Sequence, residues 1–327
     1  MTISINFDDW LSVLREEYLQ DFIKSGGASV KFIIPLDGLD TSTVLPKLKK
    51  AAEEDGYLFT SIDAATTKLH MIDKVFHATA KQVAWDDLAY KFLRLILSKE
   101  KYQLPKEKKD FNLTNLASLN GVNFGEMRRI INLLLTSALF KDYTMTQEFR
   151  IAMLRLCQSQ LDPQAPGAND AEKVKEWLHG ELRLISQLKS AYIYRKIARH
   201  NGRHMLFSLA RWLNVTGKSG LVLVLDISHF MESRRRLDGS IYYSKSAILD
   251  GYEMLRQFID STDELTYCLI LVIAPPSFLS PEEENRGLKV YDALRLRIWD
   301  EVRDKQRTNP LANLIRISNN EEAGGVQ

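Results

Sequence analysis

Hydrophobic positions along this chain follow two spacings, and each spacing predicts a different element. Short apolar runs typical of buried strands occur at 30–34, 57–62, 220–226, 268–273 and 314–317. The run at 220–226 is the strongest signal, because it is apolar throughout and ends in an acid. A central parallel strand that is covered on both faces has this pattern.

Apolar residues that recur every three or four positions predict helices between these strands. Such helices are expected over 7–24, 41–54, most of 65–160, 171–213, 244–260 and 288–307. The order strand 30–34, turn-rich loop, helix 41–54 and strand 57–62 is that of a parallel βαβ unit. The sequence therefore predicts an α/β fold, with a parallel sheet flanked by helices and a helical insertion in the middle of the chain.

Two proline-containing breaks, at 102–110 and 161–169, suggest how the chain is divided. We expect the first half of an α/β domain in 1–100, a helical insertion in 101–170, the second half in 171–318 and a disordered tail in 319–327. Within the insertion, the stretch 121–127 followed by Arg128 and Arg129 suggests a winged-helix-like element.

Composition and charge narrow this picture mainly by exclusion. The 327 residues carry 44 basic and 42 acidic side chains, so no global field indicates nucleic acid, although local patches are compatible with it. Cys157 and Cys268 lie far apart in apolar runs and are expected to be buried thiols, and no Cys and His spacing predicts a metal site. The acidic, amphipathic start is unlike a signal peptide and no apolar run is long enough to span a bilayer, so a cytoplasmic protein without membrane contact is expected.

The loop after the first long strand carries the candidate chemistry. In a P-loop ATPase this loop has the form GxxxxGK[ST]: its N–H groups cradle the phosphates, its lysine neutralises their charge and its hydroxyl holds Mg²⁺. Here the loop reads PLDGLDTS at 35–42, with Gly38 as its one glycine. Asp40 stands at the second glycine position, Thr41 at the lysine position and Ser42 at the hydroxyl position. Asp37 and Asp40 would repel a triphosphate.

A second requirement for ATP hydrolysis is also missing. The strand 220–226 keeps Asp226, which would complete a magnesium shell, but Ile227 stands where a glutamate would polarise water. We therefore expect no catalytic residue and no cofactor, and weak binding of ATP and Mg²⁺ through Ser42 and Asp226 is the alternative. Asp226 is also open to a structural interpretation, as a strand end that caps a neighbouring helix or meets Arg203 or Arg211.

Several stretches resemble a known family in their order and spacing. They are LREEYLQDFIKSGGASVKFII, WLHGE, KIARHNGRHMLFSLARWL, GLVLVLD, YEMLRQFID, LILVIAPPSFL, YDALRLRIW and NPLANLIRIS. The chain resembles the AAA+-like ATP-binding proteins of BREX-type bacterial phage-defence systems. The resemblance implies a P-loop NTPase fold. Members of the family also have a glycine-rich loop with a lysine and an Asp-Glu pair, and this chain departs from the family at both of these points. It also has Pro275 where a sensor hydroxyl is expected, so it resembles a degenerate member.

The expected function is that of a non-catalytic AAA+-like subunit of a bacterial DNA-modification or phage-defence complex. It would act through other subunits, an active ATPase among them, and through DNA. One alternative is a slow or nucleotide-binding ATPase with a non-standard phosphate loop, and another is a DNA-binding regulator.

Two sets of basic residues are candidates for contacts with partners. Arg295 and Arg297 lie where an AAA+ protein could present an arginine to a neighbouring subunit, or they face solvent with Asp292 and Asp300 as local partners. Three clusters could meet DNA phosphates, or could simply be solvated charges. They are Lys106, Lys108 and Lys109; Arg195, Lys196, Arg199 and Arg203, with Tyr192, Tyr194 and His200 interleaved; and Arg234, Arg235 and Arg236, which no acid interrupts.

Overall fold

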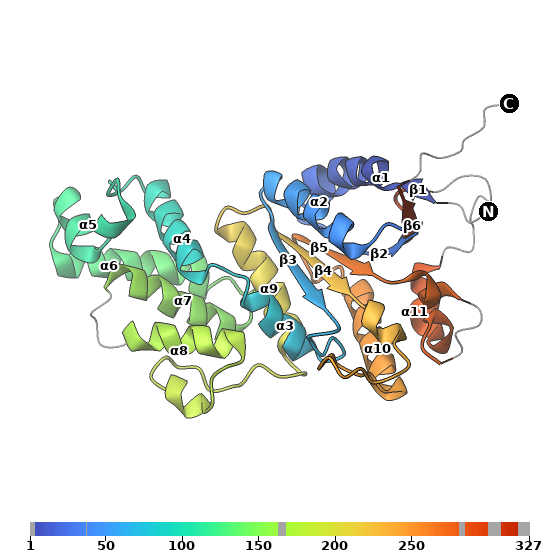
Figure 1. Ribbon diagram of the computed structural model, residues 1–327. Coiled ribbons are helices and arrows are strands. Elements are labelled where there is room, and N and C mark those ends of the chain that lie inside the picture. The colour runs from blue at the N-terminus through green and yellow to red at the C-terminus, as the bar shows by residue number, and fades with distance from the viewer. Residues whose placement is uncertain (1–3, 37, 163–167, 281–284, 300–308, 320–327) are drawn as a thin grey trace. The chain divides into compact units, whose positions relative to one another are not determined.

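The computed structural model describes residues 4–36, 38–162, 168–280, 285–299 and 309–319 (Figure 1). The chain forms two compact units: unit 1 comprises Met1–Thr79 and Ser219–Gln327, and unit 2 comprises Ala80–Lys218. The insertion bounds expected from the sequence, 101–170, lie inside unit 2. The expected tail after 319 and the second part of the expected helix 288–307 lie outside the described residues.

Unit 1 is built on a parallel sheet with the strand order β1-β6-β2-β5-β4-β3 in its described residues. The strands are β1 (Ile5–Asn6), β2 (Ala28–Pro35), β3 (Leu58–Asp63), β4 (Leu221–Asp226), β5 (Cys268–Ile273) and β6 (Leu314–Ser318). All five predicted strands are present, and the predicted α/β class with a parallel sheet is confirmed. β2, which leads into the candidate loop, is central, because β5 pairs with one side of it and β6 with the other.

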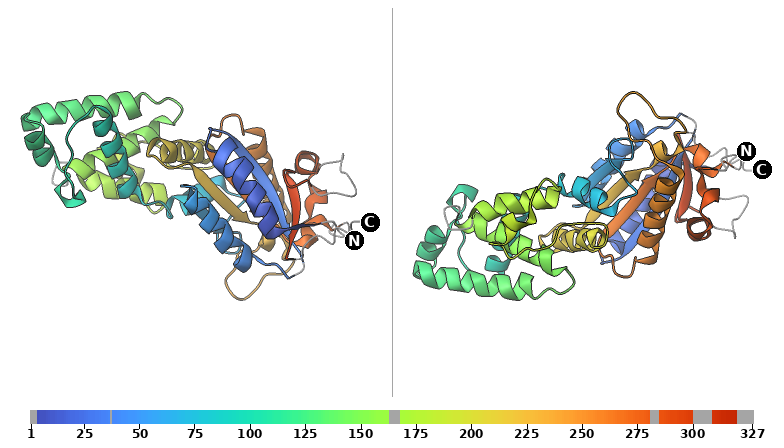
Figure 2. Two further views of the ribbon diagram at one scale, coloured as in Figure 1. Left: turned by 90° about the horizontal axis from the view of Figure 1, so that it is seen from above. Right: turned by 90° about the horizontal axis from the view of Figure 1, so that it is seen from below.

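Helices cover both faces of this sheet. On one face lie α1 (Phe7–Val13), the π-helix Leu14–Phe22 that continues it, and α2 (Thr41–Glu54), whose apolar side chains share a buried core with Ile33 and Val224. On the other face lies α10 (Lys245–Asp260), as the two opposite views of Figure 2 show. Burial on both faces explains why β4 and β5 are almost continuously apolar.

Shorter helical elements complete unit 1. They are α3 (Ile72–Ala80, whose last residue falls in unit 2), α11 (Asp292–Ile298), and the 3₁₀ turns Ser228–Met231, Pro276–Leu279 and Leu288–Val290. The expected helix 288–307 thus begins as a 3₁₀ turn and continues as the short α11.

All regular secondary structure in the described residues of unit 2 is helical. Its α-helices are α4 (Trp85–Lys99), α5 (Leu113–Leu119), α6 (Phe124–Leu135), α7 (Gln147–Leu161), α8 (Ala168–His179) and α9 (Gly202–Val215), and further turns are the 3₁₀ turns Lys108–Asp110 and Ile185–Leu188 and the π-helix Thr136–Phe140. A winged helix needs a β-hairpin, and the described residues of this unit contain no strand.

The segment between α8 and α9 corrects one expectation. The sequence predicts helices across 171–213, but residues 180–201 contain only a single 3₁₀ turn. Gly180 has a positive φ of 74°, a conformation that ends a helix. Along the parts of the chain that the structure describes, no helix is both long and apolar enough to cross a membrane.

Candidate functional site

The loop between β2 and α2 lies at the carboxyl edge of the sheet, where ligands bind in open parallel α/β folds. Backbone hydrogen bonds fix its start: Leu36 N–H donates to the carbonyl of Ile317 at 2.8 Å, and Leu39 N–H donates to that of Leu36 at 3.0 Å. The buried side chain of Leu39 belongs to the core of unit 1, and Gly38 supplies the positive φ of 77° that the turn requires. Asp37 lies outside the described residues.

Asp40 is the N-cap of α2. Its carboxylate accepts hydrogen bonds from the N–H of Thr43 at 3.1 Å and the hydroxyl of Ser42 at 2.6 Å. The Thr43 hydroxyl donates to the same oxygen at 3.2 Å. These bonds, that of Ser42 foremost, hold the pKa of Asp40 below its usual value. An acid of the chain itself therefore occupies the positive end of the helix, which in a P-loop binds phosphate.

Ser42 and Thr41 do not restore what the loop lacks. The Ser42 hydroxyl, which would face a magnesium ion in a P-loop, is engaged with Asp40. Thr41 begins α2 and its side chain carries no charge. A hydroxyl at this position cannot neutralise the β- and γ-phosphates as a lysine does.

Asp226 and Ile227 lie two strands away from this loop. Across the sheet, Ile33 of β2 is in register with Ile273 of β5, and Ile273 with Asp226 of β4. Because neighbouring strands are about 4.8 Å apart, the Cα atoms of Ile33 and Asp226 are separated by roughly 10 Å. The structure thus brings Asp226 to the same edge as the loop, as the sequence predicts for the ends of parallel strands.

The Asp226 side chain is hydrogen-bonded to the backbone at this edge. It accepts a hydrogen bond of 2.9 Å from the N–H of Ser228, the first residue of the 3₁₀ turn Ser228–Met231. Ile227 is buried, 1% exposed, and its side chain offers no group that could orient water. Sequence reasoning missed Asp63, the register partner of Asp226 at the end of β3, although both end a strand with an acid.

One cation in unit 1 escaped the sequence analysis. Lys31 lies inside β2, only 1% exposed, and its ammonium group donates to the carbonyls of Leu311 and Ala312 and lies 4.4 Å from the Tyr18 ring centroid. Burial lowers its pKa to about 8. Pro35, at the end of β2, lies four positions from Lys31, roughly 13 Å along the strand, so Lys31 cannot take the place of a lysine in the loop.

The two arginines proposed to act on a neighbouring subunit are held differently. Arg297 binds Asp260 through two nitrogens and also donates to the carbonyl of Ala293 at 2.7 Å. Among the residues that the structure describes, Arg295 pairs with Asp292 at 3.0 Å on the same helix. Pro275, where a sensor hydroxyl was expected, precedes the 3₁₀ turn Pro276–Leu279.

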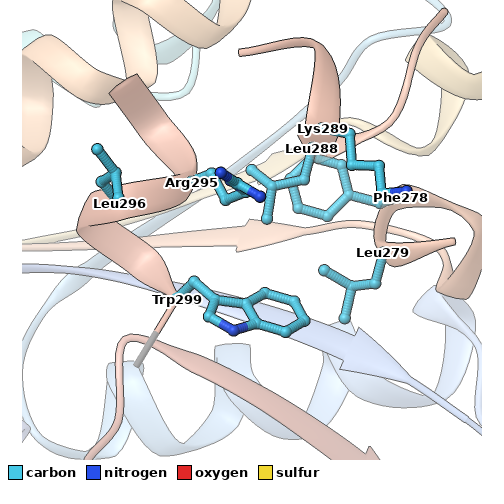
Figure 3. A pocket seen from close by; sticks show the side chains of 7 residues that line it. All are labelled: Phe278, Leu279, Leu288, Lys289, Arg295, Leu296 and Trp299. Carbon is cyan, nitrogen blue, oxygen red and sulfur yellow. The ribbon is translucent and has the colours of Figure 1, made fainter. Parts of the chain in front are cut away.

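Arg295 also borders a pocket of about 280 Å³ in unit 1. Figure 3 shows Arg295 and Trp299 extending from α11 and its C-terminal cap toward Leu288 and Leu279. The pocket is lined by Phe278, Leu279, Leu288, Lys289, Arg295, Leu296 and Trp299.

The three basic clusters differ in how their charges are paired. In the first, Lys108 binds Asp87 and Lys109 binds Glu107 at 2.8 Å. In the third, Arg234 and Arg235 are exposed, whereas Arg236 binds Glu232.

The second cluster combines exposed cations with exposed aromatic rings. Arg195 lies 3.6 Å from Glu148, and Tyr192 and Tyr194 are 62% and 60% exposed. Arg199 and Arg203 lie in the following turn and in α9, and Arg211, further along α9, pairs with Asp142 at 3.3 Å.

A parallel sheet whose central strand leads through a short loop into a helix N-terminus, with an acid ending a strand two places away, is the architecture of P-loop NTPases. The family model of the BREX system ATP-binding protein BrxC/D matches residues 11–323, so the chain belongs to this family. This confirms the P-loop type of fold and the resemblance seen in the sequence, and it makes the chain a component of a phage-defence system. No curated protein and no solved structure matches the chain.

Proposed function

We propose that this chain is a non-catalytic subunit of its BREX system, which keeps the P-loop fold but does not hydrolyse ATP. The observation that carries this proposal is the Asp40 carboxylate at the N-terminus of α2. A helix end that a carboxylate already caps repels a second anion. Thr41, beside it, supplies no compensating charge.

The end of β4, at Asp226 and Ile227, supports the same conclusion. Hydrolysis needs a group that orients the attacking water, and the residue after Asp226 is the buried Ile227. Asp226 and Ser42 are the residues through which the alternative, a slow ATPase, would hold Mg²⁺. Both already make hydrogen bonds within the chain.

Calorimetry with ATP and Mg²⁺, together with a phosphate-release assay, tests this proposal. The unmodified protein should bind no ATP at about 1 mM, a concentration that detects even weak sites, and should release no phosphate. Asp40→Gly/Thr41→Lys, which restores the glycine and the lysine, should bind ATP measurably at that concentration. Micromolar binding by the unmodified protein, with turnover that Asp226→Ala abolishes, would establish the slow ATPase instead.

A subunit without turnover acts through its partners, and we expect one of them to be an active ATPase of the same defence or DNA-modification complex. Arg295 is the better candidate for an arginine that completes the partner's site. Its pair with Asp292 is exposed, and exposed pairs contribute little free energy, so the side chain can be released at small cost. Arg297 would have to give up Asp260 and the Ala293 carbonyl.

Copurification with the other subunits of the system, followed by ATPase measurements on the complex, tests this role. Arg295→Ala should reduce the partner's kcat by 10³-fold or more if it acts as an arginine finger, without preventing assembly. Leu296→Ala, which alters the neighbouring exposed residue, is the matched control. Equal ATPase rates with and without Arg295 would exclude this role and leave the first proposal unaffected.

A further inference from the structure

A short exposed segment of unit 2 combines aromatic and basic side chains. Residues 191–197, which we call the tyrosine segment, follow the 3₁₀ turn Ile185–Leu188 and lie outside any helix or strand. Its side chains alternate between interior and solvent: Ala191, Ile193 and Ile197 are buried, whereas Tyr192 and Tyr194 are exposed. Two exposed aromatic rings close together in the chain offer a flat apolar surface to a binding partner.

The backbone of the tyrosine segment is held in place. The Trp177 indole N–H donates to the carbonyl of Arg195 at 3.0 Å, and the Asn201 amide donates to that of Lys196 at 3.1 Å. Earlier in the segment, the Ile193 N–H donates to the carbonyl of Leu188 at 3.1 Å. A platform fixed in this way loses little conformational entropy when a ligand binds to it.

The conformation of Tyr192 is unusual for its residue type. Its φ is 64°, in the left-handed region that bulky residues rarely adopt, and such strain clusters at functional sites. The Cα atoms of Tyr192 and Tyr194 are at most about 7 Å apart, the reach of two residues. Two exposed rings at this spacing can each stack on one base of the same unpaired strand.

The charge around the tyrosine segment is uniformly positive along the sequence. Between Glu181 and Asp226 the chain contains no acid and eight basic residues: Arg183, Lys189, Arg195, Lys196, Arg199, Arg203, Arg211 and Lys218. From outside this stretch, the Arg155 guanidinium lies 5.5 Å from the Tyr192 ring centroid. Glu148 also comes close, but at 3.6 Å it pairs only loosely with Arg195, whose side chain is 74% exposed.

We propose that the tyrosine segment binds single-stranded nucleic acid, with Tyr192 and Tyr194 stacking on bases and Arg195 and Lys196 contacting phosphates. Exposed rings interleaved with cations suit an unpaired strand, because every base offers a π-face and every linkage a negative charge. A duplex keeps its bases stacked and would leave the tyrosines unused. The inference does not depend on whether the chain binds ATP.

Fluorescence anisotropy with a labelled oligothymidylate of about 16 nucleotides tests the proposal at low salt. Tyr192→Ala and Tyr194→Ala should each weaken binding by about tenfold, whereas Tyr192→Phe and Tyr194→Phe should retain it because the ring remains. Arg195→Ala/Lys196→Ala should reduce the slope of log affinity against log salt concentration, which the tyrosine variants leave unchanged.

Tyr143→Ala is the matched control, because Tyr143 is a 78% exposed tyrosine of the same unit that also lies near an arginine, Arg150. It should bind the strand as the unmodified protein does. The proposal is overturned if Tyr192→Ala and Tyr194→Ala both bind the strand as tightly as the unmodified protein, or if Tyr143→Ala weakens binding as much as they do. Tighter binding of a duplex of the same length than of the single strand would assign the segment to duplex backbone contact instead. If the tyrosine variants lose binding to a protein partner but still bind the single strand, the segment is a protein interface. None of these outcomes bears on ATP hydrolysis, since the assay contains no ATP.

Discussion

The Ser42 hydroxyl donates a 2.6 Å hydrogen bond to the Asp40 carboxylate at the first turn of α2. A hydroxyl that could hold a metal ion and the acid that caps the helix are therefore hydrogen-bonded to each other. The helix end is stabilised by the chain itself and needs no nucleotide to complete it.

The first prediction concerns this cap and its dependence on pH. Hydrogen bonds from Ser42 and Thr43 lower the pKa of Asp40, so the ionised acid stabilises the folded state. That contribution is present above the ordinary Asp value of 3.8 and is lost as pH falls through the lower folded value. Asp40→Asn should therefore be less stable than the unmodified protein near neutral pH, and the difference should shrink below pH 3.8. Urea unfolding near neutral pH and below pH 3.8 measures the difference in stability, with Asp21→Asn at an exposed position as the control. A difference that persists at low pH contradicts the prediction.

The second prediction concerns Lys31, whose burial lowers its pKa to about 8 from 10.5. Between these values the unfolded chain binds more protons than the folded one, so stability should rise with pH. The gain approaches about 1.4 kcal/mol per pH unit for one proton. Lys31→Met should remove this rise, whereas the exposed Lys24→Met should keep it. Guanidinium unfolding at several pH values below 10 gives the slopes, and parallel curves for all three proteins would show that Lys31 does not titrate in this range.

The third prediction concerns Gly220, which precedes β4 with a φ of 145°. A Cβ there would lie 2.1 Å from the carbonyl oxygen of Tyr267, the atom that accepts the Leu221 N–H. Gly220→Ala should destabilise unit 1 by about 3 kcal/mol or more, from strain and overpacking together. Gly239→Ala is the control, because Gly239 also has a positive φ but a Cβ there meets nothing within 4 Å. Thermal unfolding should separate the two variants, and equal losses would show that strain alone sets the cost.

The fourth prediction concerns duplex DNA and the exposed loop at 234–236. If these arginines neutralise phosphates, Arg234→Ala/Arg235→Ala/Arg236→Ala should flatten the salt dependence of duplex binding by about one unit of slope for each phosphate that is no longer neutralised. Arg236 is paired with Glu232, so Arg234 and Arg235 should account for most of the effect. Anisotropy with duplex DNA over a salt series measures it, and an unchanged slope removes this loop as a DNA-binding site.

Much of the fold could be predicted from local patterns. Helix α2 and strand β5 have the bounds that the sequence indicates, and β4 differs by one residue, because each is a continuous pattern between polar breaks. The two-residue β1 was missed, since only its pairing with β6, more than 300 residues away, makes it a strand. The break between α8 and α9 was missed because the buried Ile193 and Ile197 follow a helix-like spacing in a segment held by side-chain hydrogen bonds.

At the candidate site, too, the sequence predicted some features and only the structure showed others. The residue types at 40–42 and 226–227 were enough to predict that the site has no lysine to bind the phosphates and no glutamate to orient the attacking water. The sequence could not show that Asp40 turns back onto α2, that Ser42 is engaged with it, or that Arg297 is bound by Asp260. Such contacts depend on rotamers and on neighbours that packing selects.

The sequence by itself determined the class of fold and the family, and it predicts that the charged groups used in ATP hydrolysis are missing, because these inferences follow from local periodicity and from the chemistry of single positions. Only the tertiary structure decided the order of the strands, the burial of Lys31 and the outward orientation of Tyr192 and Tyr194. The physical reason is that burial and register are properties of segments far apart in the chain, and they are set when those segments pack together.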